Sequence, residues 1–265
     1  MKLTVLMENT SCSEAVCHEH GLSLYLEVNG RRILFDAGQT ERFAANAQAL
    51  GVDLSAVDTA VLSHGHYDHG GGLAAFLALN DHAPIYAQRD VFQPHYHGES
   101  RYIGLDPRLM ESGRFRFTLD ALDLGDGLTL DSCAHRTPAY PLDSAGLTVQ
   151  TADGRFVPED FRHEQYLLME EAGRRILISG CSHKGILNLV DWYRPDLLIG
   201  GFHFMELDPD RPEDAARLDQ AAQVLLTYPT RYLTCHCTGK RPYAYLKERM
   251  GQRLDRLSAG MQLEL

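Results

Sequence analysis

The sequence has few basic residues and no long apolar run. It carries 25 lysine and arginine residues against 36 aspartate and glutamate residues, a formal net charge of −11. Proteins that bind nucleic acid usually show a basic surface, so we expect no polynucleotide partner. No stretch approaches the roughly 20 apolar residues of a membrane-spanning helix, and residues 2–8 read as a short strand rather than a signal peptide. We therefore expect a cytoplasmic protein with no membrane partner.

The sequence also lacks a Cys-x-x-Cys pair. A chain of 265 residues with 44% apolar composition can bury a core without disulfides, so we expect its six cysteines to be reduced. The unusual component is histidine, with 13 residues. Cys181, Cys235 and Cys237 each lie within two residues of a histidine. Histidine and cysteine are therefore the first candidates for metal-binding or catalytic residues.

The first third of the chain predicts a hairpin followed by alternating helices and strands. Two β-rich segments, 22–28 and 31–35, flank an Asn-Gly pair, which is the strongest short signal for a hairpin turn. A helix is expected over 40–50, a strand over 59–63 and a second helix over 70–80. Strands alternating with helices favour an α/β layered fold.

The second half repeats this pattern. The string Gly-Arg-Arg-Ile-Leu occurs at 30–34 and again at 173–177, each time inside a predicted hairpin. Further strands are expected at 166–170, 174–179, 196–199 and 232–234, with helices over 212–226 and 241–250. Residues 88–164 have no counterpart and are rich in proline, glycine, tyrosine and histidine. We predict a single domain over 1–265, made of two similar halves, with a substrate-facing insertion at about 88–164.

One short segment concentrates metal-binding side chains. His64, His66, Asp68 and His69 follow the predicted strand and precede a run of three glycines that opens a helix. A rigid strand end followed by glycines lets these side chains converge on one point. Imidazole and carboxylate groups suit Zn²⁺, Mn²⁺ or Fe²⁺. A polar surface loop is the alternative, but three rings held so close together would repel one another once protonated.

The pattern His-x-His-x-Asp-His resembles the signature of the metallo-β-lactamase superfamily, as does the strand-end Asp-x-Gly at 36–38. Three further segments, 178–185, 200–203 and 235–239, resemble one branch of that superfamily. This branch comprises proteins similar to dihydropterin–ribofuranosyl-aminobenzene-5'-phosphate synthase. The resemblance spans nearly the whole chain and implies a four-layer αββα sandwich with a metal pair at one edge.

The resemblance also implies a division of ligands between two divalent metal ions, Zn²⁺ in the first place and Mn²⁺ or Fe²⁺ as alternatives. His64 and His66 would bind one ion. Asp68, His69 and His236 would bind the other. Such a pair would activate a bound water as hydroxide and polarise a substrate oxygen.

Two positions depart from the family pattern. Cys181 stands where most members carry an aspartate that bridges both metals, and it could bind as a thiolate or be a small packing residue. The third histidine of the first site is expected to be His183, with His135 as the weaker candidate. Cys235 and Cys237 are expected to pack around His236. A small cluster of Cys12, Cys17, His18 and His20 is expected at the rim without a metal.

The predicted function is metal-dependent hydrolysis, or a pterin-type synthase reaction, on a small and anionic, phosphorylated metabolite. Asp68 would hold and deprotonate the nucleophile, and His203 would donate to a developing oxyanion or phosphate. Residues expected to bind substrate offer cations and aromatic rings; they are Lys184, His95, His97, Arg101 and Tyr102.

Two other classes of function remain open. A di-iron oxidoreductase could use the same scaffold, but such relatives commonly carry a carboxylate at the position of His66. A non-catalytic metal-binding sensor could hold the same metals without turnover. Iron analysis and absorbance would identify the first class, and turnover of generic ester or phosphodiester probes would exclude the second.

Overall fold

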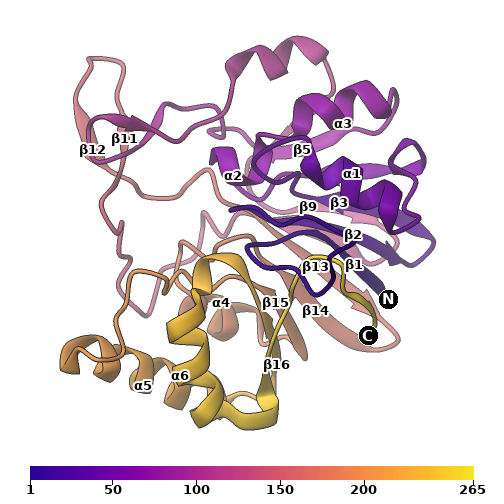
Figure 1. The fold of residues 1–265 in the computed structure, drawn as a ribbon. Helices are drawn as coiled ribbons and strands as arrows, with labels where there is room; N and C mark the ends of the chain where they lie inside the picture. The colour runs from indigo at the N-terminus through magenta and orange to yellow at the C-terminus, as the bar shows by residue number, and fades with distance from the viewer.

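The computed structural model describes residues 1–265 as two seven-stranded sheets packed face to face, with helices on both outer sides (Figure 1). α1 (Arg42–Ala49) and α3 (Leu73–Leu79) cover one sheet. α4 (Ile186–Tyr193), α5 (Pro212–Thr227) and α6 (Lys240–Met250) cover the other. The predicted αββα fold class is confirmed. α4 was not predicted, and it fills the interval between the strands that begin at 174 and 197.

The two sheets have the same topology. The first has the order β18 (Gln262–Glu264), β1 (Lys2–Met7), β2 (Ser23–Val28), β3 (Arg31–Phe35), β4 (Thr59–Val61), β5 (Ile85–Gln88) and β8 (Phe115–Thr118). The second has the order β9 (Leu122–Gly125), β10 (Leu128–Asp131), β13 (Tyr166–Glu171), β14 (Arg174–Ile178), β15 (Leu197–Gly200), β16 (Arg231–Thr234) and β17 (Leu254–Arg256). In both, the first four strands are antiparallel neighbours and the rest run parallel. The prediction of two similar halves is confirmed.

The repeated sequence string makes the same contact in each half. Asp58 accepts a hydrogen bond from the backbone N–H of Arg32 at 2.9 Å, and Asp196 accepts one from the backbone N–H of Arg175 at 2.8 Å. Each aspartate precedes the strand that pairs in parallel with the second strand of the hairpin. The second arginine of the string thus lies at the same structural position in both halves.

Three apolar layers hold the sandwich together because the central strands are buried on both faces. Leu24 and Leu26 of β2 point into the middle layer between the sheets, whereas Tyr25 points outward beneath α1 and α3. Ile176 of β14 likewise faces the middle layer, while Leu177 packs under α4, α5 and α6. Strands buried on both sides read as nearly continuous apolar runs, as these segments do.

The predicted insertion at 88–164 is only partly separate from the sandwich. It contains a third sheet of four short strands, in the order β12 (Phe156–Pro158), β11 (Leu147–Gln150), β6 (His95–His97) and β7 (Arg101–Tyr102). This third sheet stands at one end of the molecule, far from both termini (Figure 1). However, β8, β9 and β10 also lie within 88–164 and complete the two main sheets. The boundaries predicted for the insertion are therefore corrected, because they included strands of the scaffold.

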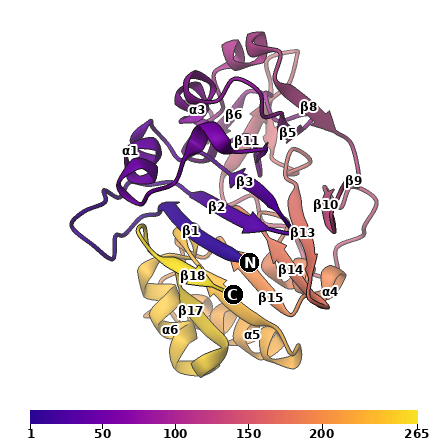
Figure 2. The same ribbon diagram turned by 90° about the vertical axis from the view of Figure 1, so that its right-hand side faces the viewer.

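The remaining elements are short. They are α2 (Tyr67–Gly70) and the 3-10 helices Leu54–Ala56, Pro107–Ser112, His236–Thr238 and Gly251–Arg253. The two termini meet on neighbouring strands β1 and β18 (Figure 2). None of the helices has the length and apolarity needed to cross a membrane.

Candidate metal centre

The candidate metal centre lies where parallel strands of both sheets end. β4 leads through residues 62–66 into α2, β14 leads into the 179–185 loop, and β16 leads into the 3-10 helix His236–Thr238. Carboxyl ends of parallel strands are the usual place for a site in α/β proteins because the loops that follow them converge at one edge. Both halves of the fold therefore contribute side chains to the same point.

The first group of possible ligands contains His64, His66 and His183, and all three side chains are buried. One nitrogen atom from each ring lies within 4.8 Å of the others. The Nε2 atoms of His64 and His183 are 3.3 Å apart. His183 therefore lies in this group, whereas His135 is exposed and belongs to no group of possible ligand atoms. Binding of metal by His183 stays a prediction.

The second group is built around Asp68 and His69. Asp68 Oδ2 lies 3.2 Å from His236 Nε2, and Cys181 Sγ lies 3.2 Å from His69 Nε2. Cys181 also belongs to a ligand group with His64 and His69. The structure thus brings the sulfur of Cys181 to the side of the site where the resemblance implies a bridging ligand.

His20 was expected at the rim, and the structure places it against the second group. Its Nε2 lies 3.1 Å from Asp68 Oδ2, and its ring centroid is 4.7 Å from that of His236. The side chain remains 41% exposed. The spacing of cysteine and histidine residues in the sequence did not predict the contact between His20 and Asp68. Residues 9–21 form an irregular loop, and only the folding of this loop brings His20 to the site.

Buried carboxylates hold the ligand loops from behind. Asp36 Oδ2 lies 2.7 Å from His69 Nδ1, which directs the other ring nitrogen toward Cys181. Glu164 accepts the backbone N–H of His183 at 2.8 Å, and Glu8 accepts that of His236 at 2.7 Å. Partners of this kind orient metal ligands and raise their basicity. The glutamates carry no motif, so sequence reasoning missed them.

The ionisation of these groups suits cation binding. Burial, together with neighbouring imidazoles, holds the pKa of His64 and that of His183 well below their usual range. Burial raises the pKa of the Asp68 carboxyl, but His69, His20 and His236 outweigh it and leave this pKa well below its usual range. Neutral His64 and His183 beside an ionised Asp68 are the protonation states that a divalent metal requires. Burial lowers the pKa of His69, but Asp36 and Asp68 outweigh it and raise this pKa, so His69 would release a proton on binding a metal. The donor set therefore fits the metal pair that the resemblance implies.

A cavity of about 1160 Å³ opens above these groups. Its floor includes His66, Asp68, Cys181, His183 and His236. Its walls carry basic side chains from separate elements, namely His97 and Arg101 of the third sheet, His203 after β15, and Arg211 and Arg217 at α5. Burial lowers the pKa of His203 to about 4, so this ring is neutral at pH 7. The cavity is large enough for a drug-sized metabolite.

Three of the predicted substrate-binding residues do not line this cavity. Lys184 is buried, and its Nζ donates to the carbonyl oxygens of Ser132 and Glu164. His95 is buried against Glu159, and the Tyr102 hydroxyl donates to the Leu105 carbonyl at 2.7 Å. The structure therefore gives no support to substrate contact by these three side chains, which stays a prediction. His97, Arg101 and His203 do line the cavity.

Comparison with known proteins assigns the chain to a family. The model of the metallo-beta-lactamase superfamily matches residues 19–166, more than half of the chain. The chain belongs to this superfamily. It is 29% identical over 266 residues to the 7,8-dihydropterin-6-methyl-4-(beta-D-ribofuranosyl)-aminobenzene-5'-phosphate synthase of Methanocaldococcus jannaschii, with 91% of this chain and 88% of that protein covered.

Two other relatives agree with this assignment. An uncharacterized protein of Methanocaldococcus jannaschii is 27% identical over 256 residues, covering 93% of this chain and 94% of its own. Among solved structures, Tm1679, a metal-dependent hydrolase of the beta-lactamase superfamily, superimposes with a TM-score of 0.82 and 26% identity. That match covers 100% of this chain and 99% of the other. The whole length of the chain therefore shares the fold of these proteins.

Proposed function

We propose that the protein is a dinuclear metal-dependent hydrolase of a small anionic metabolite. The observation that carries this proposal is the convergence of two groups of metal-ligand side chains on the floor of one large cavity. His64, His66 and His183 would hold one ion, and Asp68, His69, His236 and Cys181 would hold the other. Zn²⁺ suits this set of nitrogen, oxygen and sulfur donors, with Mn²⁺ and Fe²⁺ as alternatives.

The metal pair, when bound, supplies an activated water nucleophile and polarises the oxygen of the scissile group. Asp68 is ionised and reaches the cavity, so its carboxylate accepts the proton released by the nucleophile. His203 is neutral and lines the same cavity, so its ring N–H can donate to an oxygen of the substrate. Ligand residues from both halves of the fold keep these groups in fixed relative positions.

The cavity walls favour an anionic substrate with an apolar body. Arg101 has no carboxylate partner, since its guanidinium contacts only the Tyr67 hydroxyl at 3.1 Å. Arg211 lines the cavity without an ion pair, and Arg217 pairs with Asp143 at 3.0 Å. Between these cations the walls are apolar, with Ile103, Leu142, Leu147, Phe204 and Met205 among the lining residues. Arginine at such positions suits phosphate or carboxylate recognition.

A pterin-type synthase reaction is the second candidate. Its support is the relative of that name, which is 29% identical over nearly the full length of both chains. The same metal pair and cavity would serve this reaction, so the two candidates differ in their products rather than in their site. Incubation with a phosphorylated aromatic substrate and a dihydropterin, followed by mass spectrometry, would detect the condensation product.

The proposed function is tested first by metal content and then by turnover. Purified protein should contain about two equivalents of transition metal by mass spectrometry, and the colourless zinc form should hydrolyse phosphodiester or ester probes. His64→Ala should lose at least one equivalent and about 100-fold or more of the activity. The matched control is His82→Ala, because His82 is exposed and belongs to none of the ligand groups. The proposal would be contradicted if the wild-type protein contained only trace amounts of transition metal, or if the His64→Ala variant kept full activity.

A further inference from the structure

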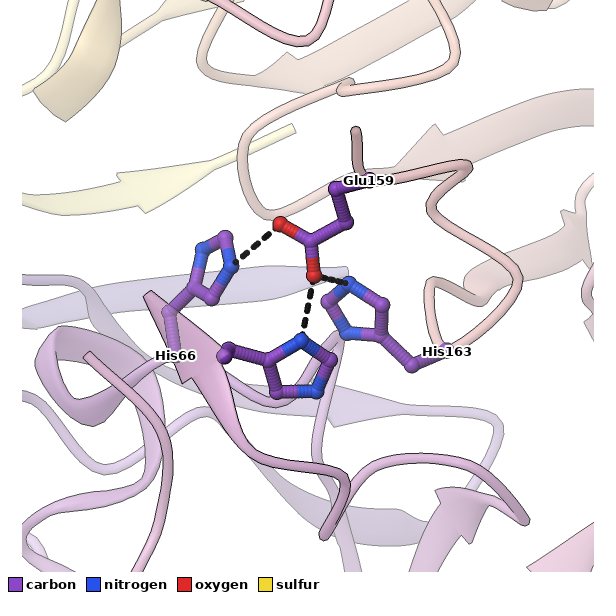
Figure 3. Close-up of side chains that lie close together, drawn as sticks. His66, Glu159 and His163 are labelled. Carbon is purple, nitrogen blue, oxygen red and sulfur yellow. Dashed lines mark hydrogen bonds and ion pairs between the residues drawn. The ribbon is translucent and has the colours of Figure 1, made fainter. Parts of the chain in front are cut away.

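Beside the predicted metal pair, one buried carboxylate is surrounded by three histidines (Figure 3). Glu159 Oε2 lies 3.3 Å from His66 Nε2, and Glu159 Oε1 lies 2.8 Å from His163 Nε2. His95 Nδ1 contacts the same Oε1 atom. All four side chains are buried, and Glu159 and His163 are each only 2% exposed. None of His95, Glu159 or His163 belongs to the metal pair, so this cluster needs its own explanation.

The hydrogen bonds of His163 disfavour a third metal ion in this cluster. The backbone N–H of Gly65 donates to His163 Nδ1 at 2.9 Å. A backbone N–H can only donate, so Nδ1 carries no proton and neutral His163 must carry its proton on Nε2. That proton faces Glu159. Binding of a metal at Nε2 would require an imidazolate or the loss of the Gly65 hydrogen bond.

The proton of His66 is likewise located by its hydrogen bond. An ionised carboxylate can only accept hydrogen bonds, so the hydrogen bond between His66 Nε2 and Glu159 Oε2 places the proton of His66 on Nε2. Its lone pair is then on Nδ1. His66 is also the one residue shared between this cluster and the group that contains His64 and His183. The ring therefore connects the carboxylate to the first metal position.

We propose that Glu159 is a positioning residue that fixes His66 in the Nε2–H form, so that Nδ1 is the atom presented to the first metal ion. His163 and His95 hold the carboxylate in place. The contacts at Oε1 are close but bent, since this atom, His163 Nε2 and His95 Nδ1 lack aligned hydrogen-bond partners. The bond to His66 is the aligned one, so the carboxylate acts chiefly on the ligand.

The packing of Gly65 supports a tight connection between the cluster and the ligand loop. A Cβ atom at Gly65 would lie 2.2 Å from the Val91 carbonyl oxygen and 2.8 Å from His95 Nε2. Only glycine lets the His64–His66 segment approach the cluster this closely. His95 comes from β6, and Glu159 and His163 follow β12, so the third sheet and its flanking loop supply every member except His66. The third sheet thus helps to orient a metal ligand in addition to forming a cavity wall.

The tautomer of His66 can be measured directly. Long-range ¹H–¹⁵N spectra of histidine rings distinguish a protonated Nε2 from a protonated Nδ1, in both metal-free and zinc-loaded protein. The proposal expects His66 in the Nε2–H form in wild type and a mixture of tautomers in metal-free Glu159→Gln. A wild-type His66 with its proton on Nδ1 would overturn the proposal. This readout needs no activity, and it decides the role of Glu159 even if the proposed hydrolase function fails.

Zinc affinity gives a second readout. Glu159→Gln should weaken binding of one of the two ions by about 10- to 100-fold in chelator competition, and leave the other nearly unchanged. Glu159→Asp, which keeps the charge, should recover part of this loss. Asp160→Asn is the matched control, because Asp160 is the exposed neighbour that pairs with Arg162, and it should leave both affinities unchanged. Equal weakening of both ions with a lower melting temperature would indicate a merely structural role. Three equivalents of metal in wild type and two in Glu159→Gln would indicate the third-ion site instead.

Discussion

At the scale of the residue, the recurring feature of this protein is a buried carboxylate behind several of the candidate ligands. Asp36 contacts His69, Glu164 accepts from the loop of His183, and Glu8 accepts from the loop of His236. Isolating a charge from water is costly unless hydrogen bonds compensate it. These carboxylates are compensated by the backbone N–H groups and rings that they orient, so each is both a structural anchor and a constraint on ligand geometry.

Glu8 should contribute measurably to stability through this anchoring. Its Oε1 accepts the His236 N–H at 2.7 Å, and its Oε2 accepts from the backbone and hydroxyl of Thr10. Glu8→Gln replaces one acceptor by a donor and should cost about 1–3 kcal/mol in urea denaturation because buried N–H groups lose their partner. Glu14→Gln, at an exposed position of the same segment, is the control. Equal stability of the two variants would contradict the anchoring role.

Cys181 should make metal binding depend on pH. Burial raises the pKa of its thiol well above the usual range, so the metal-free protein holds a neutral thiol at pH 7. A ligating thiolate must release that proton, and affinity should therefore rise with pH. Calorimetry in buffers of different ionisation enthalpy should show about one more proton released by wild type than by Cys181→Ser. The same proton count in both proteins would show that Cys181 is not a ligand.

At the scale of the element, the two halves are built from the same hairpin followed by a parallel strand. Segments with alternating or continuous apolar residues and a two-residue turn were predictable, because hairpin geometry and strand burial are local. The strands of the third sheet were not predictable. β6 spans only His95–His97 and β7 only Arg101–Tyr102, and such short polar strands form through pairing with β11 rather than through their own pattern.

Asp58 should stabilise the first half in a pH-dependent manner. A hydrogen bond from the Arg32 side chain leads the causes that hold the pKa of the Asp58 carboxyl below its usual range, although partial burial opposes them. A lowered folded-state pKa means that the stabilisation is present above the unfolded pKa, about 4, and is lost as pH falls through the folded value. The pair is largely exposed, so Asp58→Asn should cost only about 0.5–1 kcal/mol at pH 7.

Urea denaturation at pH 7 and at about pH 2.5 measures this difference between wild type and Asp58→Asn. The gap in unfolding free energy should narrow at the lower pH, because protonation of Asp58 has the same effect as the substitution. A gap that stays constant between the two pH values would contradict an ionic contribution. Asp81→Asn is a suitable control, since Asp81 is fully exposed and contacts only His82.

At the scale of the whole molecule, two similar halves place their strand ends at one edge, and the third sheet adds a wall above it. The candidate ligands divide between the halves, with His64, His66, Asp68 and His69 from the first and Cys181, His183 and His236 from the second. The cavity is thus formed by parts of the chain far apart in sequence. The wall residues lie apart from the candidate metal ligands, so we expect them to affect binding separately from chemistry.

Arg101 should contribute to substrate binding rather than to the chemical step. Arg101→Ala removes a cation from the cavity wall without touching a metal-ligand group, so the KM for an anionic probe should rise about 10-fold with kcat nearly unchanged. Steady-state kinetics with an anionic and a neutral probe measures this. Arg108→Ala is the control, because Arg108 pairs with Asp106 and lies outside the cavity. An equal effect on both probes would contradict a role in charge recognition.

The sequence by itself determined an α/β layered fold with repeated hairpins, because turn chemistry and strand burial are local properties, and its six-residue His-x-His-x-Asp-His motif carried the resemblance that implied the αββα class and the candidate metal site. Only the tertiary structure placed His183 beside His64 and His66, left His135 exposed, brought His20 to Asp68 and assembled His66, His95, Glu159 and His163. His64 and His183 are 119 positions apart, and His66 and Glu159 are 93 apart. Contacts over such separations depend on how sheets and loops pack, and no local pattern encodes that packing.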